Sequence, residues 1–274
     1  MMKKIISAFL VMLSVTTVRG QVVVAPTVLF LSDQSPFGTF LVMNRSDTPQ
    51  EITISFRFGF PQYDSLGGLS MQYNDSSMAR EHSCQDWLRG FPQRFIINPG
   101  QEQVVRLLAA GPPNIPDGEY WTRLITSSTP QAKPVDSTGT GIRTNITFIL
   151  QQVTTVIYKK GYANTTANIE QVQELPDSAA IGLLARVSHG GNSPFFGRIS
   201  IDVKNGAGKT VYSDQEVLAI YQREAFIKFS VPRSGLSAGS YSAEIKLDSQ
   251  RSDVPSEDLL AVPTVTKTVA FSIR

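Results

Sequence analysis

Alternating apolar and polar positions recur along most of this chain. In one segment, the apolar residues Phe95 and Ile97 occupy alternate positions. The next residues, 98–100, are Asn-Pro-Gly, a combination typical of turns. Val105 and Leu107 then resume the alternation. This pattern predicts a strand, a turn and a second strand.

The same alternation predicts strands in other segments that are rich in β-branched and aromatic residues. These segments are residues 21–31, 39–44, 51–58, 119–126 and 145–158. Helical periodicity is nearly absent. Short runs of this kind, separated by Gly, Pro, Asn and Asp, are typical of antiparallel β-sandwiches. We therefore predict the all-β fold class.

The N-terminus has the features of a secretory signal peptide. Lys3 and Lys4 precede an apolar run, residues 5–15, that small and β-branched residues follow. This run is shorter than the roughly 20 apolar residues that a membrane-spanning helix needs, and no later segment reaches that length. We expect residues 1–20 to be cleaved and the exported protein to have no membrane span.

The remaining sequence is long enough for two domains. A chain of 274 residues, less the signal peptide, accommodates two immunoglobulin-like β-sandwiches of about 100 residues or more each. A small polar segment, 160–166, interrupts the strand pattern. We therefore predict an N-terminal immunoglobulin-like domain at 21–160 and a C-terminal immunoglobulin-like β-sandwich at 161–274.

Local patterns add detail within these domains. Residues 197–214 alternate, pass through a Gly-rich segment and alternate again, which predicts a hairpin. In contrast, residues 62–83 and 127–141 contain many small polar residues and few apolar ones. We interpret both of these stretches as loops.

Charge and cysteine content exclude several classes of function. The chain has 25 basic and 23 acidic residues, so its net charge of +2 gives no field suited to nucleic acid. Cys84 is the only cysteine, so no disulfide forms within the chain, and we expect a partly buried small residue there. One cysteine and two widely separated histidines are too few for a usual zinc site, so we predict no metal site. No cofactor is implied either.

One motif suggests a hydrolase, but its context does not fit. Residues 235–239 read Gly-x-Ser-x-Gly, the pattern of a catalytic serine turn. Such a turn needs a following helix, whereas the next residues alternate like a strand, and both histidines precede Ser237 instead of following it. We predict a protein that is not an enzyme and has no small-molecule substrate.

The order of several short motifs resembles the first domain of PapD-like periplasmic pilus chaperones. A Trp-Leu pair, a Pro-x-x-Phe strand, a Pro-Gly turn and a Val-Arg-Leu strand occur in that order between residues 86 and 108, and Pro-Asp-Gly-Glu-Tyr follows at 116–120. The segments VAPTVLFL and FLVMNRSDTPQEITISF are similar to the first two strands of the family. Weaker similarities, GNSPFFGRISIDVKN and GLSAGSYSAEIKL, extend the resemblance over most of the mature chain.

The resemblance implies a periplasmic protein with its two domains in an L-shaped arrangement. In this family the last strand of the first domain inserts alternating apolar side chains into a pilus subunit, which is called donor-strand complementation. Ile146, Phe148 and Leu150 match these positions. The implied function is a chaperone for pilus or fimbrial subunits, whose partners are a subunit and possibly an outer-membrane usher. The pattern alone fits equally well a strand that faces the protein's own core.

The resemblance also assigns two pairs of polar residues. Typical members hold the C-terminal carboxylate of the subunit with two basic residues, and the matching positions here are Thr27 and Thr155. A threonine hydroxyl donates a hydrogen bond but supplies no charge. The ion pair that joins the two domains in the family matches Glu119 and Lys159.

A different class of function is compatible with the same fold, because immunoglobulin-like domains host many functions. Two such domains also suit a structural or adhesive secreted protein that passes no subunit on. A protein of that class would lack an open donor edge. The exposure of the strand that carries Phe148 therefore distinguishes the two hypotheses.

Overall fold

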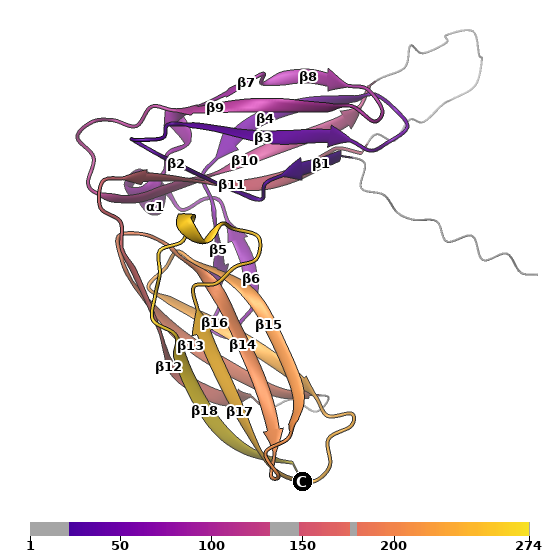
Figure 1. Cartoon of the computed structure of the whole chain (residues 1–274), viewed down its shortest axis with the longest axis vertical. Helices are drawn as coiled ribbons and strands as arrows, with labels where there is room; N and C mark the ends of the chain where they lie inside the picture. Colours follow the sequence, from indigo (N-terminus) through magenta and orange to yellow (C-terminus); the bar gives the residue numbers. More distant parts are fainter. Residues whose placement is uncertain (1–21, 132–147, 176–179, 274) are drawn as a thin grey trace, which may run out of the picture.

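The computed structural model describes residues 22–131, 148–175 and 180–273, which form two β-sandwiches set at an angle (Figure 1). The prediction of an all-β chain with two sandwich domains in an L-shaped arrangement is confirmed. The predicted signal peptide lies outside the described residues. Within the described ranges, no helix combines the length and the apolar character needed to cross a membrane.

The first sandwich consists of two sheets. One sheet has the order β1 (Val22–Ala25), β3 (Phe37–Asn44), β9 (Glu102–Ala109), β7 (Leu88–Phe91). The other has the order β2 (Val28–Ser32), β11 (Leu150–Lys160), β10 (Gly118–Pro130), β4 (Gln50–Arg57), β8 (Arg94–Ile97). Every second side chain points inward, and the core between the sheets includes Phe40, Ile52, Val105, Leu107 and Val156. Cys84 is buried in this core, and burial raises the pKa of its thiol.

The second sandwich also has two sheets. One has the order β12 (Thr165–Leu175), β13 (Ala180–Gly191), β16 (Glu224–Pro232). The other has the order β15 (Thr210–Ile220), β14 (Phe195–Asn205), β17 (Gly239–Asp248), β18 (Val265–Ile273). The hairpin predicted at 197–214 is confirmed, because β14 and β15 pair in antiparallel fashion. The chain passes from one sandwich to the other between Lys160 and Thr165.

The interpretation of residues 62–83 as a loop is wrong for most of that stretch. It contains most of a hairpin of β5 (Phe60–Tyr63) and β6 (Leu69–Gln72), followed by helix α1 (Ser76–His82). Asp75 caps the helix, since its carboxylate accepts hydrogen bonds from the backbone N–H groups of Ser77 and Met78. The described residues also include two short 3-10 helices, at Gln85–Trp87 and Ser256–Asp258. Local side-chain caps thus order a segment whose composition is typical of loops.

A third apolar cluster joins the two sandwiches. The first sandwich and its hairpin contribute Phe58, Phe60 and Trp121, and the second contributes Phe196, Tyr221 and Val254. The ring centroids of Trp121 and Tyr221 lie 4.9 Å apart, a distance typical of aromatic pairs. The junction is therefore a packed interface and not a bare linker.

Candidate functional site

Among the described strands, β11 has a neighbour along its whole length on one side only. On that side, β10 pairs with it from Leu150 to Lys160. On the other side, β2 pairs in parallel with the stretch from Thr155 to Lys159 alone. Within the described part of the chain, no strand pairs with Leu150–Thr154 on that second side. The first half of β11 is therefore a free edge.

The apolar side chains at this free edge are not buried. Val156 and Tyr158 point into the core of the first sandwich, and Leu150 follows the same alternation. Leu150 is nevertheless 37% exposed, and Phe148, two residues earlier, is 77% exposed. These two residues therefore do not fill the protein's own core. Ile146 lies outside the described residues.

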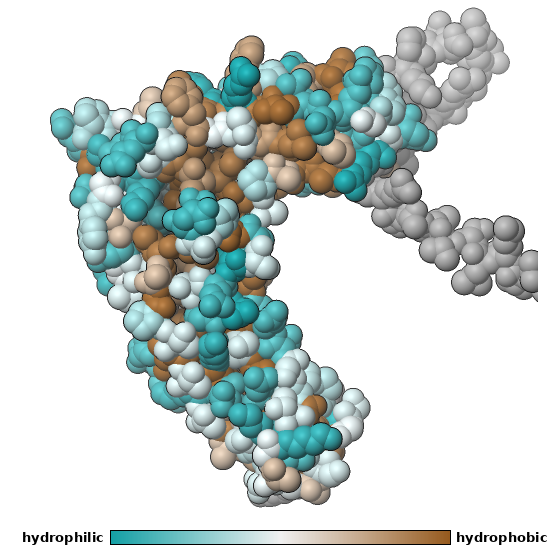
Figure 2. Space-filling model, viewed as in Figure 1, coloured by the Kyte–Doolittle hydropathy of each residue, from teal (hydrophilic) through white to brown (hydrophobic). Residues whose placement is uncertain are grey.

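Apolar side chains are also exposed at the neighbouring positions of this segment. Ile149 and Val153 are both exposed large apolar residues. Apolar residues gather over the first sandwich and the junction, while hydrophilic residues predominate toward the tip of the second sandwich (Figure 2). Exposed apolar surface of this kind on a soluble domain is typical of a protein-binding site.

The backbone of the free edge has hydrogen-bonding groups available. The Thr155 N–H donates to the Thr27 carbonyl at 2.9 Å, toward the β2 side. Because the N–H and C=O groups of alternate residues point to the same side, those of Gln151 and Val153 point toward the open side. An added strand would pair with these groups. One side chain does link this stretch to the N-terminal strand, because the Gln152 side-chain amide donates to the Val22 carbonyl at 2.8 Å.

The two threonines that match the family's basic positions lie beside each other at the end of the free edge. The Thr27 hydroxyl donates to a carboxylate oxygen of Asp253 in the second sandwich, at 3.4 Å. The Thr155 hydroxyl accepts a hydrogen bond from the Arg123 guanidinium. Neither hydroxyl is therefore an isolated surface group.

Arg123 brings a positive charge next to Thr155. The family resemblance in the sequence did not point to this residue. It lies on β10, directly opposite Thr155 in the strand register, and is only 4% exposed. Its Nε atom donates to the Gly59 carbonyl at 2.9 Å, and its guanidinium lies 5.2 Å from the ring centroid of Tyr221. Among the described residues, its Nη2 atom has no hydrogen-bond partner. A cross-strand neighbour is invisible in a position-by-position comparison, which is why Arg123 was missed.

Glu119 and Lys159 are cross-strand partners on β10 and β11. Both belong to the first sandwich, so a contact between them would not itself join the two domains. Glu119 is only 3% exposed, and burial raises the pKa of its carboxyl to about 7 while the charge of Lys159 opposes this shift. The contact of Glu119 with the second sandwich is through its backbone, since its N–H donates to the Asn192 carbonyl at 3.1 Å.

Asn192 forms several polar contacts across the junction. Its side-chain N–H groups donate to the carbonyls of Asp117 and Tyr162, each at 3.0 Å, and its side-chain oxygen accepts from the Asn164 N–H at 2.8 Å. A buried or half-buried asparagine that satisfies this many groups fixes the geometry around it. The sequence offered no sign of this role beyond a turn composition.

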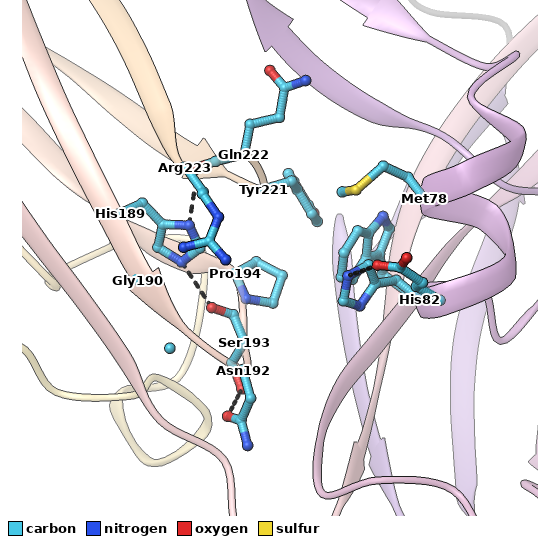
Figure 3. A pocket seen from close by; sticks show the side chains of 13 residues that line it. Met78, His82, His189, Gly190, Asn192, Ser193, Pro194, Tyr221, Gln222 and Arg223 are labelled. Atoms are coloured by element: carbon cyan, nitrogen blue, oxygen red, sulfur yellow. Dashed lines mark hydrogen bonds and ion pairs between the residues drawn. The ribbon is translucent and has the colours of Figure 1, made fainter.

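A cavity of about 280 Å³ lies at the junction, between α1 and the second sandwich (Figure 3). His82 stacks on Trp121 with ring centroids 4.6 Å apart, and burial lowers the pKa of His82. Both ring nitrogens of His189 lie within 3.0 Å of the backbone carbonyls of Gln222 and Ser193, and burial lowers its pKa as well. Each histidine thus has structural contacts of its own.

The serine of the Gly-x-Ser-x-Gly motif lies elsewhere. Ser237 is in the turn between β16 and β17, and the shallow cavity at that turn contains no histidine. Among the described residues, no group of three His, Cys, Asp or Glu side chains is placed to hold a metal ion. The geometry around Ser237 does not support nucleophilic catalysis.

Comparisons with known proteins give matches among solved structures alone. No protein-family model and no curated protein matches this chain. Among solved structures, the YadV chaperone is similar with a TM-score of 0.46 and 11% identity, over 92% of this chain and 100% of that one. A chain of the CsuC–CsuE chaperone–tip adhesion subunit complex of Acinetobacter baumannii gives 0.46 and 12%, over 92% and 98%. The CupB2 chaperone of Pseudomonas aeruginosa gives 0.46 and 11%, over 92% and 100%.

Proposed function

We propose that this protein is a periplasmic chaperone for pilus or fimbrial subunits and that it binds a subunit through the free edge of β11. The observation that carries the proposal is the exposure of Phe148 and Leu150 at a stretch of β11 that no strand of the described residues covers. An exposed apolar edge strand promotes aggregation unless a partner covers it. A subunit that lacks one strand of its own sandwich is a partner of that kind.

The binding would combine backbone pairing with side-chain burial. The free N–H and C=O groups of Gln151 and Val153 would pair with a strand of the subunit, while Phe148 and Leu150 would enter its apolar groove. Ile146 would occupy a third position. Full burial of an apolar side chain contributes about 1.5 to 3 kcal/mol. Because Phe148 and Leu150 are 77% and 37% exposed, the two together would contribute about 2 to 3 kcal/mol before the cost of ordering is subtracted. This magnitude suits a complex that later transfers its subunit, with an outer-membrane usher as the possible receiver.

Thr155 and Thr27 would contact the subunit at the end of the same edge. Because the Thr155 oxygen accepts from Arg123, the hydroxyl hydrogen remains free to donate to an acceptor on the subunit. The positive charge of Arg123, one strand away, would favour a negatively charged acceptor at that position. The Thr27 hydroxyl already donates to Asp253, so Thr27 would contact the subunit mainly through van der Waals packing.

The test is capture of the subunit from cells. The tagged mature protein would be recovered from the periplasm of its native host, and the proteins that co-purify would be identified by mass spectrometry. Phe148→Asp is the test variant. Phe91→Asp is the matched control, because Phe91 is 76% exposed against 77% for Phe148 but lies on β7, in the other sheet.

We expect the unchanged protein and Phe91→Asp to retain one small secreted subunit, and Phe148→Asp to lose it by at least about tenfold, which corresponds to about 1.4 kcal/mol. Circular dichroism would verify that all three proteins are folded. Retention of the subunit by Phe148→Asp would refute binding through this edge. Absence of any subunit with the unchanged protein would favour a structural or adhesive secreted protein instead.

A further inference from the structure

The β5–β6 hairpin leaves the first sandwich and runs along the second (Figure 1). At its base, Phe60 is completely buried in the cluster that joins the two sandwiches, and its ring centroid lies 6.1 Å from that of Tyr221. Farther along, β5 contacts both β15 and β16 of the second sandwich. The hairpin is thus rooted at the junction and lies against the other domain.

The middle of the hairpin contributes to the core of the second sandwich. Tyr63, the last residue of β5, packs against the buried residues of that core. Burial and the nearby charge of Glu216 on β15 raise the pKa of the Tyr63 hydroxyl to about 12. Tyr63 belongs to a hairpin of the first domain, yet it packs, partly buried, against the core of the second sandwich.

The tip of the hairpin fits closely against the second sandwich at Gly67. A Cβ atom at this position would lie 2.6 Å from Lys228 Cβ, which is closer than real Cβ contacts, and 3.0 Å from the Lys228 backbone nitrogen, which is closer than most of them. Gly67 also has a φ of +84°, which favours glycine. The turn itself is well ordered, since the Asp64 carboxylate accepts from the N–H groups of Leu66 and Gly68, each at 2.8 Å.

We infer that this hairpin is a strap that fixes the angle between the two sandwiches. A rotation about the short connection between Lys160 and Thr165 would withdraw Tyr63 from the second core and drive the tip at Gly67 against Lys228. Packed interfaces of this type resist gradual deformation. The strap therefore also keeps Thr27 opposite Asp253, at the end of the free edge of β11.

Distance measurements between two nitroxide labels test this inference without any subunit present. Thr39→Cys on β3 and Thr268→Cys on β18 place one label on an exposed position of each sandwich. The native Cys84 is buried and its thiol pKa is raised, so it does not compete for the label. We expect pulsed electron spin resonance to give one narrow distance distribution for this parent protein.

Gly67→Ala is the test substitution, and Gly100→Ala is its matched control. Gly100 has a similar φ, +74°, but a Cβ there meets no atom within 4 Å, so the control reproduces the backbone strain without the clash. The clash must displace the tip by about 1 Å to reach a normal contact distance. We expect the distribution to shift or broaden for Gly67→Ala and to remain unchanged for Gly100→Ala.

Tyr63→Ala provides a second test that does not depend on the turn. Loss of the partly buried ring should broaden the distribution because the hairpin then loses its contact with the second core. Thermal unfolding of every variant would establish that it is folded, and Tyr63→Ala decides the question if Gly67→Ala does not fold. Distributions that match the parent for the folded variants would overturn the inference, whatever the outcome of subunit capture.

Discussion

The two ends of β11 differ in what lies beside them, although both pair with β10. From Thr155 to Lys159, the strand also pairs with β2, and Val156 and Ile157 are completely buried. From Leu150 to Thr154, no described strand pairs on that side, and the apolar residues Leu150 and Val153 are exposed. One continuous strand is thus an interior strand at one end and an edge strand at the other.

The cause of the difference lies in the N-terminal strands. β1 pairs with β3 in the opposite sheet, and only after Pro26 does the chain join β11 as β2. The N-terminal segment therefore covers the last part of β11 and leaves the first part open. The comparison teaches that alternation in a sequence reports which side chains share a face but not whether anything covers that face.

The largest expected effect is a difference in stability between substitutions at the two ends. Ile157→Ala removes a completely buried side chain and should lower the free energy of unfolding by about 2 to 5 kcal/mol. Phe148→Ala removes a side chain that is 77% exposed and should change it by no more than about 0.5 kcal/mol. Urea denaturation of both variants measures the difference. Similar losses at both positions would show that the free end is covered in solution.

Local patterns in the sequence were sufficient to predict many strands and turns. The strand, turn and strand around Asn98–Gly100 are present as β8 and β9, and Gly100 has the positive φ that such a turn requires. The partners of these strands did not follow from the pattern. β8 pairs with β4, whereas β9 pairs with β3 in the opposite sheet, because this turn crosses between the sheets.

The features that the sequence did not predict depend on contacts between distant residues. Arg123 acts next to Thr155 only because β10 and β11 pair in that register, and Asn192 reaches the Asp117 carbonyl only when both sandwiches are in place. Among the described strands, β5 and β6 pair only with each other, and Tyr63 packs against the core of the second sandwich. Periodicity describes one segment at a time, so it contains no information on such partners.

The second-largest expected effect is a pH dependence of the free energy of unfolding. It arises at the covered end of β11, where Lys159 lies opposite Glu119. Burial raises the Glu119 pKa from 4.5 to about 7, so the folded protein keeps this proton at a pH where the unfolded chain has released it. The contribution to stability is therefore fully present below about pH 4.5 and is lost as pH rises toward about 7, by up to about 3 kcal/mol.

Glu119→Gln removes this dependence because an amide does not titrate. We expect the unfolding free energy of the unchanged protein to fall more steeply than that of Glu119→Gln between about pH 5 and pH 8, measured by urea denaturation at several pH values. Lys159→Gln should make the fall larger, since the Lys159 charge favours the ionised carboxyl. Parallel curves for the unchanged protein and Glu119→Gln would contradict the raised pKa.

The smallest expected effect lies at Thr155, where the free and covered parts of β11 meet. Thr155→Val has almost the same shape but removes the oxygen that accepts from Arg123, and the guanidinium then has two nitrogen atoms without a partner, Nη1 as well as Nη2. A buried donor without a partner costs about 1 to 3 kcal/mol. Thr155→Ser keeps the hydroxyl and is the matched control, so urea denaturation should show a clear loss for Thr155→Val and a smaller one for Thr155→Ser. Equal losses would mean that the contact with Arg123 contributes nothing, and that the two parts of β11 differ only in whether β2 covers them.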